Sequence, residues 1–182
     1  MRMLDALNQD NFIVIDNFID TNSANALYKH FVAETKDHPE MFKRDPQCPK
    51  SMSIYNFRWF LELLINKIPF MDEIMEEPMF PTYSYARLYS HGEELIKHVD
   101  KPICEVSVSM HLGSDGTEWP IYVTKPNKEI VGINLKPGQA IIYYGLEAAH
   151  WRDKFEGQEY GQVFLHYVKG RGNNWKRYFD KE

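Results

Sequence analysis

The chain has 182 residues, the length of one ordinary domain. Its 26 Asp and Glu against 21 Lys and Arg give a formal net charge of −5, which argues against nucleic acid as a partner because duplex binding depends on neutralising phosphates. The sequence shows neither a signal peptide nor a run of about 18 apolar residues. We therefore expect a cytoplasmic protein with no membrane partner, whose two cysteines, Cys48 and Cys104, are free thiols.

The first 80 residues predict one strand and several helices. The apolar, β-branched run 12–15 is typical of a strand. Asp20 and the polar residues after it offer N-caps for an amphipathic helix. Residues 36–52, with three prolines and many charges, predict a mobile loop. Apolar residues then recur three and four positions apart over 55–68, which predicts a helix, and a further short helix is expected before Pro78.

From residue 81 the pattern changes to short β-type runs separated by turns. Eight such runs at this spacing are typical of two facing antiparallel sheets in a jelly roll. We expect an all-β core with flanking helices, the N-terminal helices packed on one sheet. The whole chain is predicted to be one domain, with a strand and helices at 12–80, the core at 81–169 and a tail at 170–182. The runs are 82–90, 95–99, 104–112, 119–124, 129–134, 139–144, 149–154 and 161–169.

The third run, 104–112, has one polar and one apolar face. Ser107, Ser109 and His111 alternate with valine and methionine, and side chains two apart in a strand point to the same face. We expect the apolar face to pack on the helices and the polar face to line a pocket. The basic and aromatic tail at 170–182 is expected to dock on the domain rather than to bind single-stranded nucleic acid.

A candidate metal site lies at the end of the second run. His98 and Asp100 are two residues apart, so in an extended strand their side chains project into the same space. His150, at the start of the seventh run, is the candidate third ligand. An HxD tripeptide also occurs by chance in many proteins. Two imidazoles and one carboxylate, however, are the ligand set of non-haem Fe(II) oxygenases, in which the opposite metal positions stay open.

These residues, together with their surroundings, resemble a known family. The chain is similar to the Fe(II)- and 2-oxoglutarate-dependent dioxygenases, most nearly their prolyl-4-hydroxylase-like branch, from about residue 12 to about residue 168. The residues that carry the resemblance are Tyr89, Gly92, His98, Asp100, the stretch 137–143 and His150.

The resemblance implies a fold, a reaction and a set of ligands. The fold is the double-stranded β-helix, in which the HxD motif ends the second strand and the second histidine lies on the seventh, as in the predicted runs. The reaction is hydroxylation of a peptide or small-molecule substrate with release of succinate and CO2. His98, Asp100 and His150 would hold Fe(II), with 2-oxoglutarate as co-substrate and O2 as oxidant.

The residue that binds the far carboxylate of 2-oxoglutarate departs from the family pattern. An Arg or Lys about ten residues after the second histidine usually donates two hydrogen bonds to it, but residues 159–162 of this chain hold no basic residue. Arg152 shares a strand face with His150 and is the favoured substitute, because an inward arginine needs an anionic partner. Arg87 is the alternative. Tyr89, Gln162 and Ser109 are weaker polar candidates.

Several alternatives stay open at this stage. Arg152 could instead form a surface ion pair with Asp153 or Glu156, and Arg87 could pair with Glu105. The whole protein could be a cupin-type metalloenzyme that does not use 2-oxoglutarate, or a jelly-roll binding module without turnover. The sequence leaves the substrate and the oligomeric state undetermined.

Overall fold

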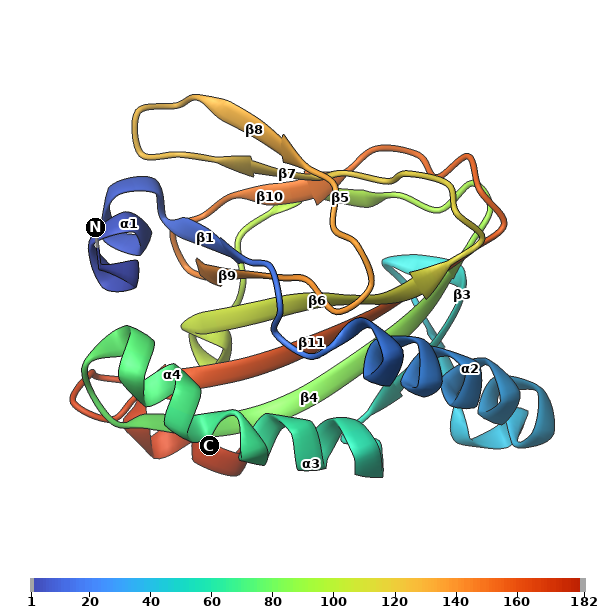
Figure 1. Cartoon of the computed structure of the whole chain (residues 1–182), viewed down its shortest axis with the longest axis horizontal. Coiled ribbons are helices and arrows are strands. Elements are labelled where there is room, and N and C mark those ends of the chain that lie inside the picture. Colours follow the sequence, from blue (N-terminus) through green and yellow to red (C-terminus); the bar gives the residue numbers. More distant parts are fainter. Residues whose placement is uncertain (1, 181–182) are drawn as a thin grey trace.

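Two antiparallel sheets face each other across the centre of the molecule (Figure 1). The computed structural model describes residues 2–180. The larger sheet has seven strands in the order β1-β9-β6-β11-β4-β3-β2, and the smaller has four in the order β5-β10-β7-β8. The strands are β1 (Phe12–Ile15), β2 (Lys43–Asp45), β3 (Cys48–Tyr55), β4 (Met79–Ser90), β5 (Leu95–His98), β6 (Val106–Ser114), β7 (Ile121–Thr124), β8 (Ile130–Ile133), β9 (Ala140–Tyr144), β10 (His150–Arg152) and β11 (Glu159–Lys169).

The eight strands predicted after residue 81 correspond in order to β4 through β11. Their ends shift by a few residues, and β4 begins earlier, at Met79. His98 ends β5 and His150 begins β10, as the resemblance implies. The predicted jelly roll is therefore confirmed, together with the strand over 12–15.

Within residues 2–180, four α-helices complete the architecture: α1 (Met3–Asp10), α2 (Thr21–Asp37), α3 (Arg58–Asn66) and α4 (Ile68–Met75). Figure 1 places α2, α3 and α4 against the outer face of the larger sheet, which confirms the predicted packing. The Asp20 side chain caps α2 by accepting a hydrogen bond from the backbone N–H of Ser23 at 2.9 Å. The helix predicted over 55–68 is shorter than expected, because Tyr55 still belongs to β3. The sequence patterns do not predict α1.

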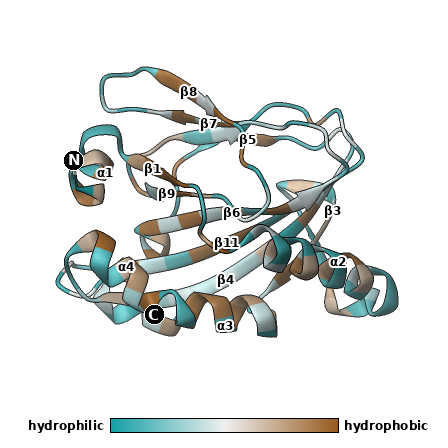
Figure 2. Cartoon of the chain, in the orientation of Figure 1, coloured by the Kyte–Doolittle hydropathy of each residue, from teal (hydrophilic) through white to brown (hydrophobic). Residues whose placement is uncertain are grey.

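The main hydrophobic core lies between the larger sheet and these helices. On β6, Val106, Val108 and Met110 are fully buried on this side. The intervening Ser107, Ser109 and His111 are also buried, on the opposite face between the two sheets. Figure 2 shows the matching alternation of hydrophobic and hydrophilic residues along the strands. The predicted division of this strand into an apolar and a polar face is confirmed.

The prediction of a mobile loop over 36–52 is wrong. After the short 3-10 helix η1 (Pro39–Met41), residues of β2 and β3 form a hairpin, and β3 joins the sheet by pairing with β4, Ser53 opposite Arg87. Prolines and charges give this segment the composition of a loop, but pairing with a distant strand determines its structure. Cys104 is likewise not in a strand: it ends the 3-10 helix η2 (Pro102–Cys104). Both cysteines are buried free thiols.

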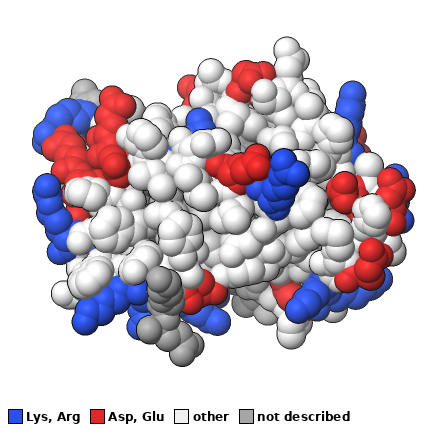
Figure 3. All heavy atoms as spheres, turned by 90° about the horizontal axis from the view of Figure 1, so that it is seen from below, with Lys and Arg blue, Asp and Glu red and all other residues white. Residues whose placement is uncertain are grey.

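The C-terminal segment folds back onto the larger sheet as η3 (Trp175–Asp180). The Tyr178 ring contacts the Phe80 ring edge-on, as expected for a docked tail, although Trp175 and Phe179 stay partly exposed. No helix within residues 2–180 is long and apolar enough to cross a membrane. On the face shown in Figure 3, which carries α3 and α4, basic and acidic side chains are interspersed, so this face offers no broad basic surface for a nucleic acid backbone.

Candidate functional site

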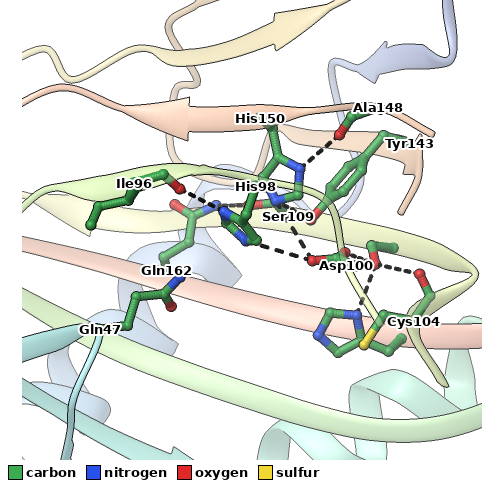
Figure 4. A network of polar contacts seen from close by, with 12 residues as sticks. Gln47, Ile96, His98, Asp100, Cys104, Ser109, Tyr143, Ala148, His150 and Gln162 are labelled. Atoms are coloured by element: carbon green, nitrogen blue, oxygen red, sulfur yellow. Dashed lines mark hydrogen bonds and ion pairs between the residues drawn. The ribbon is translucent and has the colours of Figure 1, made fainter. Parts of the chain in front are cut away.

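The pairing of β5 with β10 brings the three predicted metal ligands together. His150 lies directly opposite His98 in this antiparallel pair. Asp100 follows β5, and its backbone N–H donates to the carbonyl oxygen of Gly145 at 2.7 Å. One donor atom from each of the three side chains lies within 4.8 Å of the others, and the Asp100 Oδ1 atom is 3.7 Å from both imidazole Nε2 atoms. Figure 4 shows the three side chains converging from these separate segments.

Backbone carbonyl groups orient both imidazole rings. His98 Nδ1 lies 2.7 Å from the Ile96 carbonyl oxygen, and His150 Nδ1 lies 2.9 Å from that of Ala148. A carbonyl oxygen can only accept, so each Nδ1 carries the proton and each Nε2 keeps a free lone pair. Burial lowers the pKa of His150, against the opposite effect of the Asp100 carboxylate. The neutral form that binds a metal is therefore the favoured one.

Asp100 is held by two polar side chains behind it. The Ser107 hydroxyl donates to Asp100 Oδ2 at 2.8 Å, and His166 Nδ1 lies 2.9 Å from the same hydroxyl oxygen. Because the serine proton points to the carboxylate, His166 donates its Nδ1 proton to Ser107. Burial lowers the pKa of His166 to about 4, so the ring is neutral. This relay holds Oδ2 and leaves Oδ1 facing the two imidazoles, the arrangement in which outer groups orient a ligand.

Asp100 also lies close to Cys104 and His166, a second group whose donor atoms are within 4.8 Å of one another. Its members are already engaged. The Cys104 thiol contacts the Tyr83 hydroxyl at 3.1 Å, and burial raises the pKa of this thiol to about 12. A metal binds the thiolate rather than the thiol, so His98, Asp100 and His150 form the better candidate centre.

Two further residues, Tyr143 and Gly145, lie beside the centre. The Tyr143 hydroxyl on β9 lies 3.4 Å from His150 Nε2, and burial raises the pKa of this phenol, which keeps it protonated. Gly145 lies so close to the loop before β6 that an added Cβ would collide with the Cys104 carbonyl oxygen and come within 2.8 Å of Asp100 Oδ2. Tyr143 belongs to the 137–143 stretch of the resemblance, whereas nothing in the sequence marks Gly145.

A cavity of about 680 Å³ opens onto the candidate centre. Aromatic side chains of the larger sheet, among them Tyr83, Tyr85 and Phe164, line one wall. Lys101 and Arg177 lie at its edge. The volume is within the range of about 300 to 1,000 Å³ that is usual for small-molecule sites.

Arg152, the favoured carboxylate anchor, is 2% exposed and points inward two residues after His150. Its guanidinium donates to the Trp119 carbonyl oxygen and to Gln162 Oε1, and it lies over the rings of Trp119 and Tyr160. No carboxylate among the described residues forms an ion pair with it, so the alternative pairs with Asp153 and Glu156 are not formed. Neither Arg152 nor Gln162, which contacts it, belongs to the lining of this cavity.

Arg87 does line the cavity, and it is paired differently from the expected alternative. Its guanidinium donates to Asp45, at the end of β2, and to the Tyr89 hydroxyl at 3.0 Å. The alternative pairing with Glu105 is not formed: that carboxylate instead accepts from the Lys169 backbone N–H at 3.0 Å. Arg87 Nε is buried without a hydrogen-bond partner. Tyr89 therefore contacts Arg87, whereas Gln162 contacts Arg152 and donates to Ser109 Oγ at 2.7 Å.

Comparisons with known proteins assign the fold to a structural class. No protein-family model and no curated protein sequence matches the chain. Solved structures do match: a 2OG-Fe(II) oxygenase family oxidoreductase from Burkholderia pseudomallei superposes with a TM-score of 0.73 at 12% identity, over 91% of this chain and 89% of that one. The chain therefore has the double-stranded β-helix fold of the 2-oxoglutarate oxygenases.

Two further solved structures share this fold over most of the chain. A prolyl-4-hydroxylase from Pseudomonas putida matches with a TM-score of 0.73 at 13% identity, over 93% of this chain and 98% of that one. EctD from S. alaskensis, solved with 2-oxoglutarate and 5-hydroxyectoine, matches with a TM-score of 0.73 at 14% identity, over 91% of this chain and 74% of that one. The fold expected from the resemblance to the prolyl-4-hydroxylase-like branch is confirmed.

Proposed function

We propose that this protein is an Fe(II)- and 2-oxoglutarate-dependent dioxygenase that hydroxylates its substrate and releases succinate and CO2. The observation that carries the proposal is the preoriented donor set. His98 and His150 present Nε2 lone pairs, and Asp100 presents Oδ1, toward one point in the lining of the cavity. Two imidazoles and one carboxylate suit Fe(II) and leave open positions for other ligands. The fold and its neighbours add support from the oxygenase class.

The chain's own residues supply a negative charge, orient the carboxylate that carries it, and form the wall of the adjacent cavity. Asp100 brings one negative charge, and Ser107 with His166 holds its carboxylate in place. When bound, the metal with its keto-acid co-substrate and O2 supplies the oxidising power that a protein side chain lacks. Aromatic side chains line the cavity beside this centre and give it a largely apolar wall.

We propose Arg152 as the anchor of the far 2-oxoglutarate carboxylate. A buried guanidinium without a carboxylate partner is costly unless an anion joins it. Arg152 lies two residues after His150 on the same face of β10. The backbone positions of the two residues are therefore about 7 Å apart along the strand. Gln162 and Ser109 add polar groups beside Arg152. Arg87 is the second candidate because it lines the cavity, but Asp45 already neutralises it.

Substitution of the two arginines separates these candidates. Arg152→Gln is expected to raise the apparent KM for 2-oxoglutarate by roughly 10- to 100-fold, the usual loss for a hydrogen bond to a charged group, with iron affinity unchanged. The matched control is the double variant Arg87→Gln with Asp45→Asn, which removes the ion pair without leaving a lone charge. Succinate formation at varied 2-oxoglutarate measures both. A large KM increase only in the double variant would assign the anchor to Arg87.

An anaerobic titration tests the proposed function directly. The purified apoprotein is titrated with Fe(II) and then with 2-oxoglutarate, and the visible charge-transfer band of a chelated keto acid is recorded. We expect the band to appear with one equivalent of each. Iron binding without the band would favour the cupin-type metalloenzyme, and a band without succinate release on exposure to O2 would favour a binding module.

We further propose that the chain acts as one domain of this kind in the cytoplasm. Two buried free thiols fit a reducing compartment. The substrate is proposed to be a small molecule or a peptide residue that reaches the centre through the cavity. The acidic composition gives no support for nucleic acid as a partner.

A further inference from the structure

One wall of the cavity is built almost entirely of aromatic rings. Tyr55 on β3 stacks on Tyr83 of β4 with ring centroids 4.9 Å apart, and Tyr83 contacts the His166 ring on β11 at 4.5 Å. Tyr85 and Phe164 continue the wall at a centroid distance of 6.3 Å. All five side chains line the cavity. They lie on three neighbouring strands of the larger sheet, so the wall is continuous.

The hydroxyl groups of this wall are already used by the protein. Tyr55 donates to Asp180 Oδ2 and Tyr85 donates to Asp45 Oδ2 at 2.6 Å, while the Tyr83 hydroxyl contacts the Cys104 thiol at 3.1 Å. What the wall presents to a ligand is therefore ring faces rather than free hydroxyl donors. Ring faces attract flat π-systems through offset stacking and edge contacts. The hydroxyl groups of a polyol would find few free hydrogen-bonding partners among these tyrosines.

Two cations lie at the edge of the same cavity. Lys101 directly follows the candidate ligand Asp100, and Arg177 comes from η3; both line the cavity and are exposed. Neither forms an ion pair with a carboxylate among the described residues. Asp180 also lines the cavity; it accepts the Tyr55 hydroxyl hydrogen bond and forms no ion pair with either cation. In a chain of net charge −5, two cations without an ion pair within residues 2–180 beside one cavity are a specific feature rather than a general surplus.

We propose that the substrate of this site is a small planar aromatic or heteroaromatic acid, whose ring stacks on the wall formed by Tyr55, Tyr83, Tyr85, Phe164 and His166 and whose anionic group meets Lys101 and Arg177. This inference rests on the proposed function, because it places the ring beside the candidate metal centre. The cavity volume of about 680 Å³ suits a co-substrate and a small molecule together. The hydrogen bond from Tyr55 to Asp180 joins η3 to β3 across the edge, which favours a compact ligand over a peptide chain.

Three probe ligands separate charge from shape. trans-Cinnamate carries both features, cinnamamide lacks the charge, and 3-cyclohexylpropanoate keeps the charge without the flat ring. Each probe is titrated into the full chain by calorimetry, first without metal or co-substrate. The titration is then repeated under anaerobic conditions with Fe(II) and 2-oxoglutarate. We expect cinnamate to bind about tenfold more tightly than either analogue, since both stacking and ion pairing contribute. Equal affinity for the three probes would overturn the proposal.

Variants then locate the anionic group. Lys101→Gln and Arg177→Gln are each expected to weaken cinnamate binding by up to about fivefold, as for exposed ion pairs, and to leave cinnamamide binding unchanged. Lys176→Gln is the matched control. It removes one positive charge next to Arg177 in the sequence, but Lys176 does not line the cavity. An equal effect in the control, or none in the two variants, would contradict the assignment.

The outcomes for this proposal and for the proposed function can be told apart. Binding of cinnamate to the full chain without metal does not depend on iron or 2-oxoglutarate. If the acid binds but the visible keto-acid band never forms, the ligand class stands and the dioxygenase function fails. If the band forms but the planar acid binds no better than its analogues and leaves succinate release unchanged, the function stands and the substrate class fails.

Discussion

His150→Ala is expected to lower the affinity for Fe(II) by more than about 100-fold, since even changes to groups behind a metal ligand cost about 10- to 100-fold. The side chain is 3% exposed and contributes one of three donor atoms, so its loss leaves His98 and Asp100 as a two-ligand set. Succinate release should fall to background in the same variant. Anaerobic Fe(II) titration and a succinate assay measure both effects.

The control for this substitution is His111→Ala. His111 is also 3% exposed and neutral, because burial lowers its pKa to about 3, but it lies on β6 outside the candidate centre. Its replacement removes a buried imidazole of the same size and should leave Fe(II) affinity within about twofold, as expected for independent sites. Wild-type iron affinity in His150→Ala, or an equal loss in His111→Ala, would contradict the assignment of the ligands.

Local periodicity accounts for what could be predicted of the fold. Strands with alternating or β-branched residues are recognisable because side-chain direction repeats every two residues. The same rule places Ser107 and His111 on the inner face of β6. It also predicts that the His98 and Asp100 side chains lie close together, which they do, although Asp100 follows β5 rather than belonging to it. The position of His150 at the start of the seventh strand follows from the strand count and the family resemblance together.

Features that depend on distant pairing could not be predicted in this way. Asp45 meets Arg87 because β3 pairs with β4, and 42 residues separate the two partners. The prolines and charges of 36–52 are typical of a loop, so composition does not indicate this hairpin. Pro49 is tolerated in β3 because it lies before the part of the strand that pairs with β4. The relay from His166 through Ser107 to Asp100 likewise joins three separate segments. Each residue is visible in the sequence, but its partner is not.

The candidate centre also depends on a glycine whose role only the packing reveals. Gly145 follows β9, its N–H donates to the Glu105 carbonyl oxygen at 3.0 Å, and its own carbonyl accepts from Asp100 N–H at 2.7 Å. A Cβ here would collide with the Cys104 carbonyl oxygen, which belongs to the backbone and cannot rotate away. The segment that carries Asp100 must then move.

Gly145→Ala is therefore expected to cost about 1 to 3 kcal/mol of folding free energy, as for other overpacked sites, and to weaken Fe(II) binding at least tenfold through displacement of Asp100. Thermal unfolding and anaerobic iron titration measure the two effects. Gly132→Ala is the matched control: on exposed β8, its added Cβ would come within 2.9 Å of the Tyr122 ring, which can shift, and only into ordinary contact with Pro120 at 3.8 Å. Iron affinity should stay at the wild-type level in this control. Wild-type stability and iron affinity in Gly145→Ala would show that the close approach of these segments does not position the carboxylate.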